Sequence, residues 1–185
     1  MIYVEDNFLD YKVFKDLQEY CESNTFGLVK AGDKSFSVLE TPSNVLDILK
    51  RNIGGHEISL SFIRRAYKGF DNDMRIHCDG IIANQKTSYA SVLYINQDEG
   101  VTPNGTAFYS HVEHGDYLDK DSSEDEFNRL ILEDSNDDSK WEMTSMVKSK
   151  QNRLLTYDAN YFHAKFPKEI ESGERVVLVC FYTKE

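Results

Sequence analysis

The sequence has few cysteines, no long apolar run and no surplus of basic residues. Its three cysteines, Cys21, Cys78 and Cys180, are odd in number and far apart, so we expect reduced, mostly buried thiols rather than a disulfide framework or a zinc site. No apolar run reaches the length of a membrane span, and residues 1–6 lack the basic and apolar regions of a signal peptide. These absences predict a cytoplasmic protein that does not enter a membrane.

The shortage of basic residues is concentrated in one segment. The chain carries 32 Asp and Glu against 21 Lys and Arg, a formal net charge of −11. Residues 115–142 hold eleven of the acidic and three of the basic residues, so the rest is nearly balanced. Nucleic-acid binding needs a basic face, so we expect no nucleic-acid partner. The segment at about 115–140 is interpreted as an acidic insert that either keeps the protein soluble or favours a basic peptide.

The length and pattern of the chain predict one globular domain over residues 1–185. The sequence is 40% apolar, enough for a sizeable core. We expect amphipathic helices at residues 10–22 and 43–53, and a third from Ser123 to about residue 133, where Glu126 completes a capping box. From residue 57 on, strand patterns dominate, among them residues 58–68, 75–79, 88–96, 106–112, 141–147, 153–158, 162–165 and 174–183. The fold class is therefore mostly β (α+β), with a closed or double-sheet core.

A metal-binding pattern lies in the short stretch Arg75-Ile76-His77-Cys78-Asp79-Gly80. Side chains two residues apart in an extended strand point the same way, so His77 and Asp79 share a face. One imidazole and one carboxylate are two ligands for a metal that accepts nitrogen and oxygen, and His163 supplies a third. Two histidines and one carboxylate form the facial triad of non-haem iron(II) oxygenases, which leaves coordination positions open.

A single arginine begins the last strand pattern. Arg175 follows His163 by twelve residues and shares its strand face with Val177, Val179 and Phe181. If that face is inward, a guanidinium lies at the mouth of an apolar pocket, where a lone buried cation needs a partner. A dicarboxylate would supply one through a bidentate, charge-assisted pair.

Taken together, these residues resemble the iron(II)- and 2-oxoglutarate-dependent dioxygenases, and within them the prolyl 4-hydroxylase-like branch. Three further matches carry the resemblance to that branch. Tyr67 precedes His77 by ten residues, Tyr94-Ile95-Asn96 is similar to a Tyr-Leu-Asn strand, and Gly105-Thr106-Ala107-Phe108 is similar to a glycine-containing segment that ends in an aromatic residue. The resemblance covers residues 59–182 and implies a double-stranded β-helix (jelly-roll) core with N-terminal buttressing helices.

The resemblance also implies a set of roles. His77, Asp79 and His163 would hold Fe(II) and form the catalytic centre. Arg175 and Tyr94 would bind 2-oxoglutarate, and Tyr67 would line the cosubstrate or substrate side. The implied reaction uses dioxygen and releases succinate and carbon dioxide, with ascorbate as a candidate further cofactor. Its substrate would be peptidyl, with proline the first candidate, or a small amino-acid-like molecule; residues 110–150 have no counterpart in a minimal prolyl hydroxylase, so the sequence leaves this choice open.

Several alternatives remain at this point. The chain could be a non-catalytic metal-binding jelly roll, or a cupin-like metalloenzyme that does not use 2-oxoglutarate. A nucleic-acid dealkylase of similar fold carries a second Arg six residues after the first, where this chain has Phe181. His111 and His114 are candidates for a second metal site, but a strand running into a loop turns them to opposite sides. Whether the acidic insert is a lid over the site is left open.

Overall fold

The computed structural model describes residues 1–32, 34–71, 73–96, 104–119 and 121–184. Its helices are α1 (Tyr11–Ser23), α2 (Ser43–Asn52) and α3 (Glu124–Arg129), followed by a π-helical turn at Leu130–Asp134 and a 3-10 turn at Asp138–Lys140. The strands are β1 (Ile2–Asp6), β2 (Gly27–Ala31), β3 (Lys34–Glu40), β4 (His56–Tyr67), β5 (Ile81–Ile82), β6 (Gln85–Lys86), β7 (Tyr89–Tyr94), β8 (Gly105–His111), β9 (Trp141–Lys148), β10 (Arg153–Asp158), β11 (His163–Phe166) and β12 (Glu174–Lys184).

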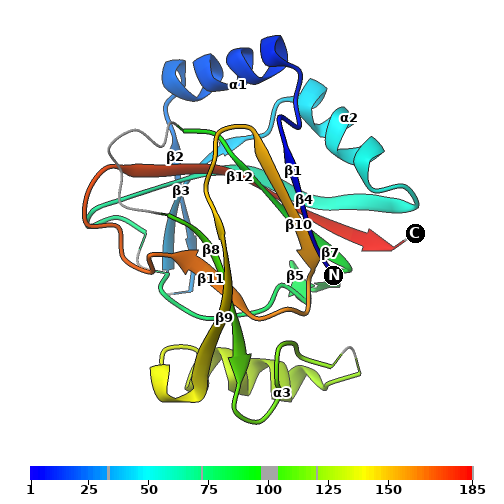
Figure 1. Cartoon of the computed structure of the whole chain (residues 1–185), viewed down its shortest axis with the longest axis vertical. Coiled ribbons are helices and arrows are strands. Elements are labelled where there is room, and N and C mark those ends of the chain that lie inside the picture. Colours follow the sequence, from blue (N-terminus) through cyan, green and yellow to red (C-terminus); the bar gives the residue numbers. More distant parts are fainter. Residues whose placement is uncertain (33, 72, 97–103, 120, 185) are drawn as a thin grey trace.

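Two antiparallel sheets face each other and form the jelly-roll core that the sequence predicts. The major sheet has seven strands in the order β1-β10-β7-β12-β4-β3-β2, and the minor sheet has three in the order β11-β8-β9. Helices α1 and α2 lie over the outer side of the major sheet, and α3 lies beyond the minor sheet at the opposite end (Figure 1). The expected double-stranded β-helix with N-terminal buttressing helices is confirmed.

Alternating side chains divide the interior into three apolar clusters. On β12, Leu178 packs under α1 and α2, whereas its neighbour Val177 packs between the sheets with Val92 and Tyr94 of β7. Consecutive strand residues point to opposite faces, so both faces of the central strands are buried. The third cluster lies outside the minor sheet, where Leu130 covers side chains of β8 and β11.

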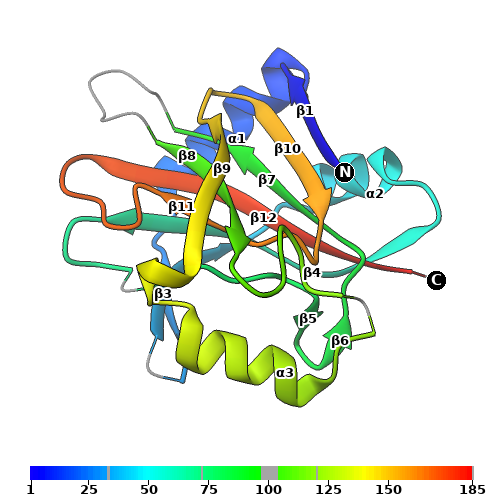
Figure 2. The ribbon, with the colours of Figure 1, turned by 60° about the horizontal axis from the view of Figure 1, so that its bottom comes forward.

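The acidic insert folds as the expected helix and contacts the body of the protein. Ser123 caps α3, because its Oγ accepts a hydrogen bond of 3.2 Å from the Glu126 amide. After Arg129 the helix widens into the π-helical turn. Figure 2 shows α3 running along one end of the molecule, below β3 and beside the β5–β6 hairpin.

Two local expectations were wrong. Residues 75–79 do not form a strand: only His77 pairs, in an isolated bridge with His163, because this extended segment crosses the end of the minor sheet. The hairpin of β5 and β6 was not expected, since two-residue strands leave no periodic signal.

In the described residues no helix combines the length and the apolarity that a membrane crossing requires.

The buttress should make a large contribution to stability. Leu49 on α2 is completely buried under the major sheet, whereas Leu132 in the π-helical turn is 81% exposed. Leu49→Ala removes buried methyl groups and leaves a cavity, so we expect the free energy of unfolding to fall by about 2–5 kcal/mol. Leu132→Ala is the matched control and should change it by less than about 0.5 kcal/mol. Urea unfolding followed by circular dichroism measures both, and equal effects would contradict this packing.

Candidate metal centre and cosubstrate pocket

Backbone hydrogen bonds bring the two halves of the metal motif together. The His77 amide donates to the His163 carbonyl at 3.0 Å, and the His163 amide donates to the His77 carbonyl at 2.8 Å. One further bond of 2.7 Å joins the Asp79 amide to the Ala159 carbonyl. Ile76 and Cys78 point the other way and are buried outside the minor sheet. The apolar side of this segment therefore anchors it, and its polar side presents His77 and Asp79 to the space between the sheets.

The three side chains form one compact donor group. Candidate ligand atoms of His77, Asp79 and His163 all lie within 4.8 Å of one another, and no other group of three in the described ranges meets this geometry. His77 Nε2 lies 3.6 Å from Asp79 Oδ1, and His163 Nε2 lies 3.2 Å from Asp79 Oδ2.

Each histidine is oriented by a carbonyl two residues before it. His77 Nδ1 lies 3.1 Å from the Arg75 carbonyl, and His163 Nδ1 lies 3.0 Å from the Tyr161 carbonyl. A carbonyl only accepts hydrogen bonds, so both Nδ1 atoms carry the proton and donate. The lone pairs are thereby placed on the Nε2 atoms, which face Asp79. Such outer hydrogen bonds fix the tautomer that a metal ligand needs.

The charges of the group also suit a divalent cation. Burial would raise the pKa of Asp79, but the adjacent histidines and a tyrosine hydrogen bond hold it below its ordinary value. Burial lowers the pKa of His77, and the neighbouring His163 lowers it further. Burial would lower the pKa of His163 too, but its contact with Asp79 raises it. An ionised carboxylate beside imidazoles that can release protons is the state that binds a metal.

Tyr157 belongs to this group, although the sequence analysis did not single it out. Its hydroxyl donates to Asp79 Oδ2 at 3.1 Å and lies 3.0 Å from His163 Nε2. Tyr157 is 2% exposed and packs with Leu155 and Phe108 between the sheets. In the sequence it resembles any core aromatic; its only distinguishing signal is that it shares a strand face with Leu155, which points into the core.

Arg175 is a buried cation that pairs with no acidic side chain in the part of the chain that the structure describes. It is 6% exposed on β12, its Nε has no hydrogen-bond partner, and it forms no ion pair with any described residue. Its guanidinium carbon lies 5.8 Å from the ring centre of Tyr94, whose hydroxyl shares a 2.8 Å hydrogen bond with Thr106. Burial lowers the pKa of Arg175 from its ordinary value. Because an unpaired buried charge is costly, the surroundings of Arg175 favour an anion.

A cavity opens beside His77 and Asp79. Its volume is about 300 Å³, and its walls come from β3, β4, β5, α3 and β12. A larger hollow of about 830 Å³ lies beneath α1 and includes Gln18 and Asn96. That hollow is on the other side of the major sheet from the metal centre, so the smaller cavity is the candidate substrate pocket.

Comparison with known proteins identifies a family. Residues 40–171 match the family model described as "Family of unknown function (DUF6445)". The chain belongs to the DUF6445 family. No curated protein matches the sequence.

Solved structures show which fold this DUF6445 protein shares. The non-heme alpha-ketoglutarate-dependent carbocyclase SnoK from nogalamycin biosynthesis has a TM-score of 0.66 at 14% identity, over 99% of this chain and 79% of SnoK. HygX from Streptomyces hygroscopicus, solved with nickel and 2-oxoglutarate, has a TM-score of 0.62 at 10% identity, over 99% and 82% of the two chains. A Pseudomonas putida prolyl-4-hydroxylase has a TM-score of 0.54 at 12% identity, over 100% and 92%. At these identities, the likeness shows the fold alone.

Tyr67 lies apart from the other expected site residues. It is 41% exposed at the end of β4, and its ring stacks on Phe70 with centres 5.1 Å apart. Strand alternation explains this position, because Arg64 and Phe62 point toward the cavity and Tyr67 falls on the opposite phase. Tyr67 is not among the residues that line the cavity.

His111 and His114 are adjacent, but among the described residues they form no group of three close metal donors. Their ring centres are 5.0 Å apart, and His111 Nε2 lies 3.3 Å from Asp134 Oδ2. They do not point to opposite sides as expected, because Gly115 turns the chain back and its amide bonds to the His111 carbonyl at 2.9 Å. With His114 Nδ1 3.7 Å from Glu126, they join β8 to the acidic insert.

The donor group should bind a divalent cation. We expect His163→Ala to weaken the Ni(II) affinity of the DUF6445 protein by more than about 100-fold, beyond the range typical of residues that only support a ligand. Isothermal titration calorimetry measures the affinity. His56→Ala is the matched control, because His56 lies at the start of β4 and contacts Tyr89 instead. Equal Ni(II) affinities in the two variants would show that His163 is not a ligand.

Tyr157 should tune this affinity without forming the site. Tyr157→Phe removes the hydroxyl hydrogen bond to Asp79 and keeps the ring in the core. We expect Ni(II) binding to weaken by about tenfold, as for loss of an outer hydrogen bond to a ligand. The same calorimetric titration measures it. A full loss of binding would instead make Tyr157 a ligand, and no change would make it a packing residue.

Proposed function

We propose that this DUF6445 protein is an iron(II)- and 2-oxoglutarate-dependent oxygenase, formed by one domain over residues 1–185. The observation that carries the proposal is Arg175, a buried guanidinium without an acidic partner among the described residues, which lies between the same sheets as the metal donors. A metal-binding jelly roll that does not use an anionic cosubstrate would leave this buried charge without a purpose.

The residues present fit both groups. His77, Asp79 and His163 provide three donors of the kind that non-haem iron(II) accepts and leave the remaining coordination positions open. When bound, iron(II) and 2-oxoglutarate supply the oxidising chemistry: dioxygen is consumed, 2-oxoglutarate becomes succinate and carbon dioxide, and a hydroxyl group is transferred to the substrate. The structural similarity to SnoK and HygX is consistent with this class.

The protein's own contribution is binding and orientation. Arg175 would hold the carboxylate of 2-oxoglutarate farthest from the metal, next to the Tyr94 hydroxyl, in a charge-assisted pair. The Arg75 and Tyr161 carbonyls keep both histidine Nδ1 atoms protonated, and Tyr157 donates to the Asp79 carboxylate. Because Asp79, His163 and Arg175 are at most 6% exposed, bulk water has little access to the reacting groups.

The substrate would be a peptidyl group, with proline as the first candidate, or a small amino-acid-like molecule. Similarity to the Pseudomonas putida prolyl-4-hydroxylase supports the first choice, and similarity to HygX, also solved with hygromycin B bound, supports a small molecule. The acidic surface of residues 115–142 disfavours a nucleic acid. Succinate release in the presence of candidate substrates distinguishes these classes.

An anaerobic titration with Arg175→Met tests the proposal. In the wild type, iron(II) followed by 2-oxoglutarate should produce the visible charge-transfer band of the chelate. Arg175→Met should bind iron(II) normally but lower the affinity for 2-oxoglutarate by about 100-fold, because a buried charge partner is lost. The same variant should be as stable as the wild type or more stable, because an apolar side chain replaces an uncompensated buried cation.

Arg129→Met is the matched control for this titration. Arg129 lies on α3 with a half-exposed side chain, so its loss should leave both the band and the stability unchanged. If wild-type protein binds iron(II) but gives no band, the chain is a non-catalytic metal-binding module or a cupin-like enzyme. If the band forms equally in Arg175→Met, Arg175 does not hold the cosubstrate.

A further inference from the structure

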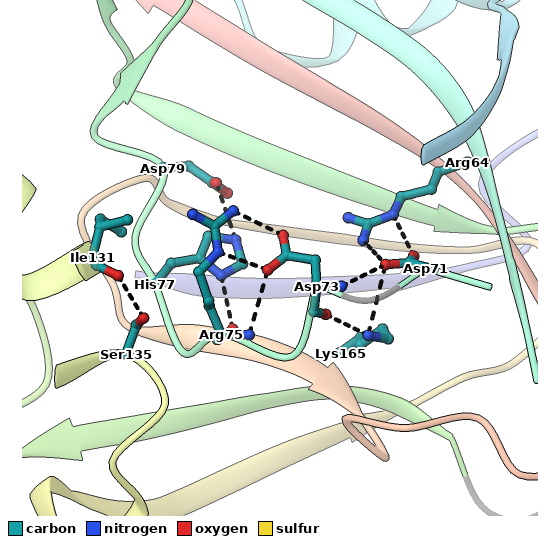
Figure 3. A network of polar contacts seen from close by, with 9 residues as sticks. All are labelled: Arg64, Asp71, Asp73, Arg75, His77, Asp79, Ile131, Ser135 and Lys165. Carbon is teal, nitrogen blue, oxygen red and sulfur yellow. Dashed lines mark hydrogen bonds and ion pairs between the residues drawn. The ribbon is translucent and has the colours of Figure 1, made fainter. Parts of the chain in front are cut away.

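A network of charged side chains forms one wall of the cavity beside the metal centre. Arg64 on β4 makes a two-pronged pair with Asp71, with Nε–Oδ2 2.7 Å and Nη2–Oδ1 2.5 Å. Arg75 makes the same kind of pair with Asp73, with Nε–Oδ1 2.7 Å and Nη2–Oδ2 3.0 Å. Lys165 contacts both aspartates: its Nζ lies 3.8 Å from Asp71 Oδ1 and donates a hydrogen bond to the Asp73 backbone carbonyl. Figure 3 shows this network continuing directly into His77 and Asp79.

The network presents its two arginines to the cavity, together with the edge of Asp73, whereas Asp71 and Lys165 do not line it. The side chains of Asp71 and Asp73 are 1% and 6% exposed, and that of Lys165 is 7% exposed. The two arginines are 18% and 26% exposed, and both line the cavity. Each aspartate therefore acts as a fixed support that orients a guanidinium, and the most exposed charged side chains of the network are the two arginines.

The charge of the network is not balanced internally. Three cationic side chains face two carboxylates. In the proposed complex the other charges cancel, because the divalent metal and Arg175 together offset Asp79 and the dianionic 2-oxoglutarate. Among the described residues one positive charge thus remains in the network as a whole; Lys165 does not line the cavity, so a substrate carboxylate would meet this charge through Arg64 and Arg75.

The remaining walls are apolar. Phe62 and Phe181 come from the inner face of the major sheet, with ring centres 6.4 Å apart, and Ile82 comes from the β5–β6 hairpin. Phe127 and Ile131 close the cavity from the acidic insert. The combination of apolar walls with a few oriented polar groups is typical of small-molecule sites.

The acidic insert does not cancel the effect of the two arginines on the cavity. Glu124 and Asp125 are exposed, whereas Phe127 and Ile131 of the same segment line the cavity. Charges in solvent are screened over a Debye length of about 8 Å at physiological salt. The contacts within the cavity are therefore decided by the arginines and not by the outer carboxylates.

We infer that the substrate is a small carboxylic acid with an apolar, ring-containing body. This inference rests on the proposed function and names its substrate class. The carboxylate binds Arg75 and Arg64, and the body lies against Phe62 and Phe181, next to His77 and Asp79. A cavity of about 300 Å³, at the lower end of the range for ligand pockets, holds such a molecule.

Three probes of equal shape test the inference: 4-phenylbutyrate, 4-phenylbutanamide and 4-phenylbutylamine. Each is titrated into the Ni(II)-loaded full chain with saturating 2-oxoglutarate, and binding is followed by ligand-observed NMR. We expect the carboxylate to bind about tenfold tighter than the amide, the difference that a charge-assisted hydrogen bond makes. The amine should bind more weakly than the amide. A carboxylate that binds no better than the amide, or not at all, overturns the inference.

Two variants locate the carboxylate site. Arg75→Gln should reduce the preference for the carboxylate over the amide to less than about twofold, because a neutral side chain makes no charge-assisted bond. The double variant Asp73→Asn with Arg75→Gln should do the same while leaving no buried carboxylate unpaired, which guards against misfolding. Arg129→Gln on α3 is the control and should keep the preference. If both Arg75 variants keep the preference for the carboxylate over the amide, Arg75 does not bind the carboxylate.

The same measurements separate this inference from the proposed function. The iron(II)–2-oxoglutarate band tests the proposed function through Arg175, whereas the carboxylate preference tests this inference through Arg75. If the wild type gives no band, the oxygenase proposal fails, yet the carboxylate preference and its dependence on Arg75 remain measurable with Ni(II) alone. The carboxylate probe could also bind at Arg175. If its advantage over the amide is seen without 2-oxoglutarate and disappears at saturating 2-oxoglutarate, the probe binds at Arg175 and the inference is wrong.

Discussion

The metal centre depends on a single antiparallel bridge between two segments that lie far apart in the sequence. His77 and His163 exchange both backbone hydrogen bonds, so the positions of two candidate ligands are set by the bridge itself. Within the described residues the segment around His77 pairs with no other strand, and it is held instead by Ile76 and Cys78, which are buried on its far side. Apolar packing on one face of this short segment thus determines the geometry of the chemistry on the other face.

The position of Arg175 in the sheet explains why its charged side chain stays buried. This residue lies on β12, which is paired on both sides by β4 and β7, so its guanidinium cannot move out to solvent without disrupting the centre of the major sheet. The fold therefore carries the cost of an unpaired buried cation, and that cost is explained if an anion is present in the working protein. Stability and the proposed binding of an anionic cosubstrate would make opposite demands on this one position.

The sequence predicts the parts of the site that follow from local periodicity. Two-residue alternation places His77 and Asp79 on one side, and it places Arg175 on the same face as Val177. The meeting of His77 with His163 could not be derived locally, because register across such a separation depends on the whole sheet; the family resemblance supplied it. Tyr157 was missed because a buried tyrosine in a strand has the same pattern whether or not its hydroxyl has a role.

The position of Tyr67 outside the cavity and the presence of the charged wall were not expected, for two different reasons. Tyr67 was assigned from its spacing to His77, although the alternation that turns Arg64 and Phe62 inward already excludes it from that face. The pairing of Asp71 and Asp73 with the arginines depends on a loop conformation, including a positive φ of 73° at Asp71, that composition does not reveal. Alternation therefore predicts strand faces well, whereas loop side chains need the structure.

The acidic insert is connected to the metal centre by direct contacts, and this changes its interpretation. The Ile76 amide donates to the Ser135 carbonyl at 2.9 Å, and Ser135 Oγ donates to the Ile131 carbonyl at 2.6 Å (Figure 3). The residue just before His77 is thus held by the segment whose Ile131 lines the cavity. A movement of this segment would alter both the shape of the cavity and the position of His77. In the proposed function the insert would therefore form a wall of the candidate substrate cavity, with Phe127 and Ile131 against the cavity and the exposed Glu124 and Asp125 on the outside.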